Sequence, residues 1–245
     1  MNLEVCVRRW SAWAPSLATA PDWLAWAHEP FAPAGDEQPA LTAMEPMMRR
    51  RMTRLGRVAL QAAWDCQQSD DDVPTVFASR YGDVRRSLGL LEELARNATV
   101  SPTGFSLSVH NAIAAMYSIA RGDRSNAICV AAGRASAAAG LIEAAGLLAD
   151  GASEVLVVCY DEALPANYAV FRDEPPCIWA WAWRVSRPGA GEGPTLSLRS
   201  GPLVAGEAQS CALPASLEVL RLFLAGGEPL VQNIDGRRWE WSRRD

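Results

Sequence analysis

The residues of this sequence best able to do nucleophilic chemistry are cysteines. Cys159 ends an apolar run typical of a parallel strand, and the active sites of open α/β sheets gather at such strand ends. Cys129 lies in a second apolar run and is near His110 in the sequence. Burial in an apolar strand raises the pKa of a thiol, and no base is placed beside either cysteine. A stand-alone acyltransferase that uses Cys159 or Cys129 is one reading of these residues.

The cysteines as a group show no metal-ligand spacing and no close pairs. Most lie inside apolar runs, which is typical of reduced core thiols in a cytoplasmic protein. We therefore expect a cytoplasmic chain with no metal site. The six cysteines are Cys6, Cys66, Cys129, Cys159, Cys177 and Cys211.

A short stretch, residues 101–162, organises the elements that would position this chemistry. Its hydrophobic pattern predicts a helix over 106–120, a buried strand over 127–132, a sharp turn at Gly133-Arg134, an Ala-rich helix over 136–148 and a strand over 154–160. The order predicts a strand-turn-helix-strand unit. Gly133 and Arg134 stand at the elbow of this unit.

Similar patterns predict the remaining elements. The expected strands are 3–10, 74–80, 177–186 (half-buried), 195–199 and 238–241, and the expected helices are 23–28, 47–68, 84–96 (Leu88, Leu91 and Leu94 inward) and 214–225. Alternation of strands and helices indicates an α/β fold, a doubly wound sheet with helices on both faces. The net charge of −5 argues against nucleic acid as a partner. No apolar run is long enough to predict a membrane span.

The stretch resembles the nucleophile region of the β-ketoacyl synthases of the thiolase superfamily. Starting from Asn111, the family pattern can be laid along this sequence without a gap. The family's nucleophilic cysteine then falls on Arg134, its following small residue on Ser136, and the acidic residue after the next strand on Glu162. The resemblance therefore implies a thiolase-like fold in which the nucleophile has been replaced.

An arginine at the elbow changes the chemistry that the resemblance implies. A thiolate there would be stabilised by the helix N-terminus, whereas a guanidinium is permanently cationic and has no lone pair for attack on a thioester. The two histidines of a complete ketosynthase are also missing, because His28 and His110 both precede the elbow. We expect a chain that is not an enzyme on its own, with a vestigial nucleophile position at Arg134.

Chain-length factors are the ketosynthase-like subunits that lack the nucleophile. The strings RRRM and SPTGFSLSVHNA and the tryptophan-rich end of this short chain resemble the chain-length factors of aryl-polyene type II polyketide pathways. The resemblance covers residues 1–170, a ketosynthase-like N-terminal domain. Residues 171–245 are then a short strand and helix extension packed on that domain, in place of a truncated C-terminal half.

The resemblance implies a heterodimer with an active β-ketoacyl synthase and a mixed sheet whose edge strand, 125–132, pairs across the dimer. The growing acyl chain would run toward that interface, where side chains of this subunit close its tunnel. The candidates for the tunnel and interface are Phe105, His110, Asn111, Met116, Cys129, Arg134 and Ser136. His110 is more often a hydrogen-bonded structural histidine in such a place. A homodimeric acyl-binding protein is a third possibility.

Arg50, Arg54 and Arg57 form a stripe on the helix predicted over 47–68. One interpretation is a dock for the acidic surface of an acyl carrier protein. A solvated or internally paired face is the alternative, and we prefer it. The resemblance implies no cofactor held by this chain, because phosphopantetheine arrives on the carrier protein.

Overall fold

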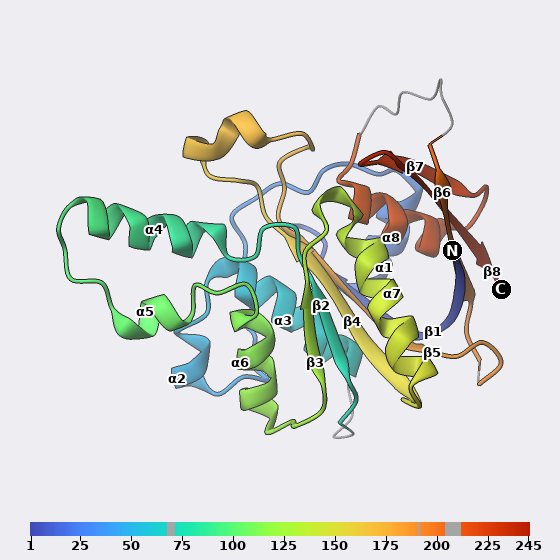
Figure 1. The fold of residues 1–245 in the computed structure, drawn as a ribbon, viewed down its shortest axis with the longest axis horizontal. Helices are drawn as coiled ribbons and strands as arrows, with labels where there is room; N and C mark the ends of the chain where they lie inside the picture. Colours follow the sequence, from blue (N-terminus) through green and yellow to red (C-terminus); the bar gives the residue numbers. More distant parts are fainter. Residues whose placement is uncertain (68–71, 191, 204–211) are drawn as a thin grey trace.

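The computed structural model describes residues 1–67, 72–190, 192–203 and 212–245, and its strands form one mixed sheet with helices on both faces (Figure 1). The strand order is β3-β2-β4-β5-β1-β6-β8-β7. Strand β2 is parallel to β3 and β4, and every other pairing is antiparallel. The strands are β1 (Asn2–Trp13), β2 (Thr75–Ala78), β3 (Ala127–Val130), β4 (Glu154–Asp161), β5 (Trp179–Ser186), β6 (Thr195–Pro202), β7 (Leu230–Ile234) and β8 (Arg237–Arg244).

Helices cover the two faces of this sheet unequally. One face carries α7 with α8 and α1, and the other carries α3 and α6, so two hydrophobic cores form on either side of the strands. Gly140 lets α7 approach closely, because a Cβ there would lie 3.0 Å from the Cβ of Ala78. The α-helices are α1 (Ala20–His28), α2 (Pro46–Arg49), α3 (Arg54–Gln67), α4 (Val84–Ala95), α5 (Pro102–Ser106), α6 (Ala112–Arg121), α7 (Ser136–Ala149) and α8 (Ala215–Ala225).

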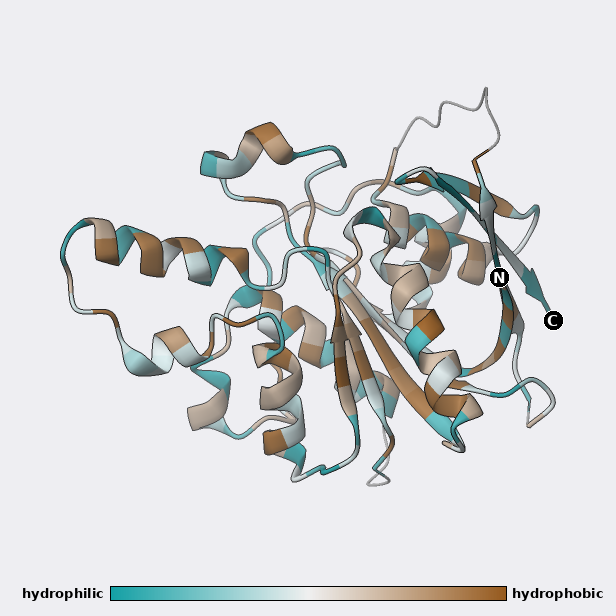
Figure 2. Ribbon diagram, in the orientation of Figure 1, coloured by the Kyte–Doolittle hydropathy of each residue, from teal (hydrophilic) through white to brown (hydrophobic). Residues whose placement is uncertain are grey.

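Strand β5 was expected to be half-buried, and this expectation was wrong. Trp179, Trp181 and Trp183 all point to one face, as alternation predicts, and they pack in the same core as α8. Ala180 and Ala182 face the opposite core and are equally buried. Since β5 lies between β4 and β1 and both its faces are covered, the Trp/Ala alternation places large and small side chains on opposite buried faces. Strands β3 and β4 of the same sheet are coloured largely as hydrophobic in Figure 2.

The helix expected over 47–68 is broken into α2 and α3. The side chain of Glu45 caps α2 by accepting from the amides of Met47 and Met48. The hydroxyl of Thr53 accepts from the amide of Gly56, 3.2 Å away, and so starts a new helix. The apolar pattern continues across both helices, so periodicity alone predicted a single element. The two caps divide it.

The helix expected over 84–96 exists as α4, but its leucines do not point inward. Leu91 and Leu94 are 54% and 58% exposed, and α4 has no buried residue. Helices α4 and α5 contact each other and project from the body as an arm (Figure 1). Amphipathic spacing predicted the helix correctly, but it could not tell whether the apolar stripe packs on this chain or on another.

The end of the chain contains a hairpin that the sequence interpretation missed. Strand β7 turns into β8 through Asp235 and Gly236, both of which have positive φ. An Asp-Gly pair between short apolar segments is typical of a two-residue hairpin turn, so the signal was present. Strands β6 and β8 are also longer than expected.

The proposed division near residue 170 is untested and stays a prediction. Strand β1 pairs with both β5 and β6, so segments from either side of that boundary share one sheet. Among the described helices, none is both long and apolar enough to cross a bilayer.

Candidate functional site

The elbow predicted at Gly133-Arg134 lies directly after the edge strand β3. Gly133 has a φ of 56° and begins a short 3-10 turn, η1 (Gly133–Ala135), from which α7 continues. The hydroxyl of Ser136 donates to the carbonyl of Gly133 at 2.7 Å and accepts from the amide of Ala132 at 3.1 Å. Ser136 therefore closes the turn, and the glycine supplies the left-handed backbone that it needs.

The guanidinium of Arg134 at this elbow forms an ion pair with a carboxylate. Its Nε lies 3.3 Å from Oε1 of Glu174, in the connection between β4 and β5, and both side chains are largely buried. The same oxygen accepts from the amide of Ala215, the first residue of α8, at 2.8 Å. A guanidinium near the positive end of a helix is thus paired with a carboxylate of the same chain.

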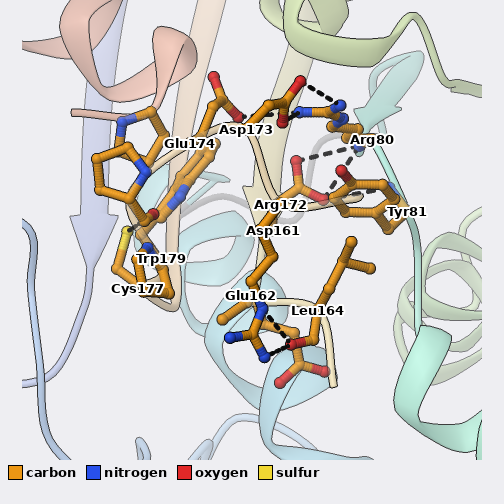
Figure 3. A pocket seen from close by; sticks show the side chains of 14 residues that line it. Arg80, Tyr81, Asp161, Glu162, Leu164, Arg172, Asp173, Glu174, Cys177 and Trp179 are labelled. Atoms are coloured by element: carbon orange, nitrogen blue, oxygen red, sulfur yellow. Dashed lines mark hydrogen bonds and ion pairs between the residues drawn. The ribbon is translucent and has the colours of Figure 1, made fainter. Parts of the chain in front are cut away.

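A pocket next to the elbow lies at the carboxyl ends of β2 and β4 (Figure 3). Both terminal nitrogens of Arg80 donate to the carboxylate of Asp173, at 2.6 and 2.9 Å. Arg80 also forms an ion pair with Glu174 at 3.4 Å. This bidentate hydrogen bonding is the main reason that the pKa of Asp173 lies below its usual value. Tyr81, Cys177 and Trp179 contribute to the walls. The pocket is therefore closed at the top by ion pairs.

Asp161 forms part of the wall of this pocket at the end of β4. Its carboxylate accepts from the hydroxyl of Ser79 at 2.9 Å and from the backbone amides of Arg80 and Tyr81. Burial raises the pKa of Asp161 to about 7, although these hydrogen bonds act in the opposite direction. Through these hydrogen bonds, Asp161 stabilises the turn that leads from β2 into α4.

Glu162 follows β4 directly, at the place expected for the acidic residue. Its Oε2 lies 2.8 Å from Nε of Arg85 at the start of α4. Burial raises the pKa of Glu162, and the charge of Arg85 opposes that shift. The ion pair of Glu162 with Arg85 therefore links the end of β4 to the base of the arm.

The helix expected over 106–120 is divided, so the four candidates in this part of the chain, Phe105, His110, Asn111 and Met116, do not share one element. Phe105 is on α5 and is 66% exposed, whereas Met116 is on α6 and packs inside this chain's own core. His110 and Asn111 lie in the turn between the two helices, because α6 begins at Ala112. His110 Nε2 is 2.9 Å from the carbonyl of Ser79, which fits the structural interpretation of this histidine.

The sequence matches one protein family along most of its length. Residues 23–242 match the β-ketoacyl synthase N-terminal domain. The chain belongs to this family. No curated protein matches it.

Solved structures of ketosynthases share the fold of this family member. A chain in the complex of the ketosynthase ApeO with its chain length factor ApeC, from Xenorhabdus doucetiae, is 29% identical, with a TM-score of 0.84 over 98% of this chain and 100% of that chain. The ishigamide ketosynthase/chain length factor is 19% identical, with a TM-score of 0.65 over 81% and 67%. A β-ketoacyl synthase from Burkholderia phymatum is 15% identical, with a TM-score of 0.62 over 91% and 69%. The last two show the fold alone.

The cysteines of this β-ketoacyl synthase family member are poorly placed for nucleophilic chemistry. Cys159 is completely buried, and burial raises its pKa well above the usual value. Burial also raises the pKa of Cys129 to about 11. The described cysteines are all free thiols, and Cys211 lies outside the described residues. Within the ranges that the structure describes, no cluster of side chains could hold a metal ion.

The three arginines of the predicted carrier patch have different surroundings. Arg54 donates to the carbonyls of Gly35 and Glu37, and Arg57 donates to the carbonyl of Arg49. Arg50 is exposed on the turn between α2 and α3. Two of the three therefore bond to backbone carbonyls of this chain, and the third is exposed to solvent.

Sequence reasoning missed the acidic residues that surround the elbow. Asp173 and Glu174 follow a 3-10 turn, η2 (Ala166–Phe171), in a connection with no periodic pattern. Asp161 was overlooked beside Glu162, although two consecutive carboxylates at a strand end are a usable signal. The contacts of Glu174 span separations of 40 residues or more, which no local pattern predicts.

Proposed function

We propose that this chain is a non-catalytic chain-length factor. It pairs with an active β-ketoacyl synthase in the cytoplasm and shapes the acyl tunnel during aryl-polyene-type chain elongation. The observation that carries the proposal is the ion pair at the elbow between Glu174 and Arg134, the residue that the resemblance aligns with the family's nucleophile. Arginine cannot form the acyl-enzyme bond, so the condensing cysteine must come from the partner.

The surface around β3 supports a partner. Strand β3 is at the edge of the sheet, and Ile128, Cys129 and Val130 are half-buried there. An apolar edge strand left open would promote aggregation, so pairing with another chain is the physically favourable outcome. Ile119 on α6, which contacts β3, is a further exposed apolar residue, and so are Leu91 and Leu94 on the arm.

Phe105 is the residue best placed for a steric role toward the partner. It lies on α5 and is 66% exposed, so most of its ring is available to enter a cavity across the interface. Bulk at such a point shortens the space for the acyl chain, because overpacking a closed cavity costs about 1 to 3 kcal/mol. Product length would follow from the size of this side chain.

The carrier protein brings the acyl chain on its own phosphopantetheine, so no cofactor is required from this subunit. Carrier docking to this chain would use Arg50, which is exposed, rather than Arg54 and Arg57. The main carrier contact then falls on the ketosynthase partner.

Co-expression with an aryl-polyene ketosynthase, followed by size-exclusion chromatography and a condensation assay with acylated carrier protein, tests the proposal. We expect a one-to-one complex that condenses malonyl units only when both chains are present. A matched sample with the ketosynthase cysteine changed to alanine should abolish activity, whereas a Cys159→Ala change in this chain should not. Acylation of this chain at Cys159 or Cys129, or a stable homodimer that ignores the ketosynthase, would instead support the acyltransferase or the acyl-binding protein.

A further inference from the structure

The carboxylate of Glu174 joins three segments that are distant in the sequence. Its Oε1 contacts Nε of Arg134 at 3.3 Å and the amide of Ala215 at 2.8 Å, and its Oε2 contacts Arg80 at 3.4 Å. The side chain is 17% exposed, so these contacts are shielded from water. One carboxylate therefore bonds to the β2–α4 turn, the elbow and the start of α8.

The start of α8 and Arg134 of the elbow each need a negatively charged partner. Pro214 precedes α8 and has no side-chain acceptor for the amides of the helix, so Glu174 supplies the anion at its N-terminus. Arg134 stands at the positive end of α7 and needs a carboxylate for the same electrostatic reason. A single residue meets both needs because η1 and α8 lie against each other.

Helix α8 matters for the stability of the whole sheet. Leu217, Leu220 and Phe223 of α8 pack in the core that contains the tryptophans of β5. The indole nitrogen of Trp181 also donates to the carbonyl of Ser216 at 3.0 Å. A displaced α8 would therefore uncover the tryptophan face of β5.

We propose that Glu174 is a positioning residue that couples the docking of α8 to the geometry of the elbow and of the edge strand before it. In this role Arg134 connects the elbow to Glu174, and the backbone of the elbow keeps its conformation as long as α8 is docked. The link to subunit assembly rests on the proposed function, since it assumes that β3 faces the ketosynthase. The coupling between α8 and the elbow does not depend on that assumption.

Amide hydrogen exchange on the full chain, read by mass spectrometry, tests the coupling with single substitutions. Arg134→Met should speed exchange in the first turn of α8, residues 215–218, by about tenfold, because it removes the ion pair that holds Glu174 beside the amide of Ala215. Glu174→Gln should speed exchange at residues 133–135 to a similar degree and keep a side-chain acceptor for Ala215. The double variant should add little to either effect, because both changes remove the same tie.

Glu240→Gln is the matched control. Glu240 pairs with Arg238 at 2.6 Å on β8, is similarly shielded, and lies in another part of the sheet. This variant should leave exchange at 133–135 and 215–218 unchanged. Arg134→Met that leaves the first turn of α8 at the level of the control would overturn the proposal.

The same variants separate this inference from the proposed function. In complex formation with the ketosynthase, Glu174→Gln should weaken binding by about tenfold and Glu240→Gln should not, if the elbow sets the position of β3. A wild-type chain that binds no ketosynthase would refute the proposed function. The exchange measurements on the chain alone would still decide whether Glu174 couples α8 to the elbow.

Discussion

Asp161 accepts a 2.9 Å hydrogen bond from the hydroxyl of Ser79, across the carboxyl ends of two neighbouring parallel strands. The bond ties β4 to the turn at the base of the arm, and the amides of Arg80 and Tyr81 point at the same carboxylate. An ionisable group at this junction makes the anchoring of the arm sensitive to pH.

We predict a stability change with pH that belongs to Asp161. Its pKa is raised from 3.8 to about 7 in the folded chain, so the folded state holds a proton that the unfolded state releases. The stabilisation from this group is complete below about pH 4 and is lost as the pH rises toward 7, with a slope of at most about 1.4 kcal/mol per pH unit. Urea unfolding at several pH values measures it.

Asp161→Asn is the variant that isolates this group. Asparagine keeps an acceptor for the two backbone amides but does not titrate. The difference in unfolding free energy between the variant and the wild type should therefore change between pH 4 and pH 7 and be flat above that range. A constant difference across all pH values would contradict the assigned pKa.

Arg134→Cys should not restore catalysis. A thiol would stand at the elbow, but His110 is bound to the carbonyl of Ser79 and His28 is exposed at the end of α1, so neither reaches it as a base. We expect no condensation product and no decarboxylation of malonyl carrier protein by this variant alone. A β-ketoacyl product formed without the partner would show that the lost nucleophile was the sole missing part.

Trp181→Ala should destabilise the chain strongly. Trp181 is fully buried, stacks on Trp183 with ring centroids 4.2 Å apart, and donates to Ser216. We expect a loss of about 3 to 5 kcal/mol in the free energy of unfolding, measured by urea denaturation. Val170→Ala, at a position 83% exposed, should change it by less than about 0.5 kcal/mol. Similar effects of the two changes would argue against α8 docking on β5.

Charges on the arm should block assembly without unfolding the chain. Leu91→Glu and Leu94→Glu place carboxylates on side chains that are already exposed, so thermal stability should be nearly unchanged. Binding to the ketosynthase should weaken about tenfold or more, because a desolvated unpaired charge is costly. Leu24→Glu, on α1 and 45% exposed, is the control that should bind normally. Unimpaired binding by the arm variants would place the interface elsewhere.

Phe105 and Met116 should respond differently to truncation. Phe105→Ala should lengthen the acyl product of the complex, measured by mass spectrometry, with little effect on stability. Met116→Ala should cost about 2 to 4 kcal/mol of stability, because Met116 is 6% exposed in this chain's own core. Phe171→Ala, on another exposed phenylalanine, should change neither property. A product shift from Phe171→Ala equal to that from Phe105→Ala would remove the special role of α5.

The central part of the fold could be predicted from the sequence because its signals are local. A continuous apolar run, a glycine and an Ala-rich segment sufficed for β3, the elbow and α7, and the edge position of β3 followed from the resemblance. The family was also predicted correctly.

The other features depend on contacts that no local pattern contains. Alternation in β5 cannot distinguish a solvent-facing strand from one between two cores, and the stripe of α4 cannot say which chain covers it. The ion pair at the elbow could not be predicted from a local pattern either, because Glu174 lies 40 residues from Arg134 in the sequence.

The sheet order has a consequence for how the chain is made. Strand β1 is flanked by β5 and β6, whose residues run from Trp179 to Pro202. Strand β1 therefore leaves the ribosome well before either of its neighbours in the sheet, by roughly ten to forty seconds at ordinary elongation rates. During that interval Leu3–Val7 stays an unpaired apolar segment. Slow synthesis of the intervening segment would prolong the period in which chaperones must protect it.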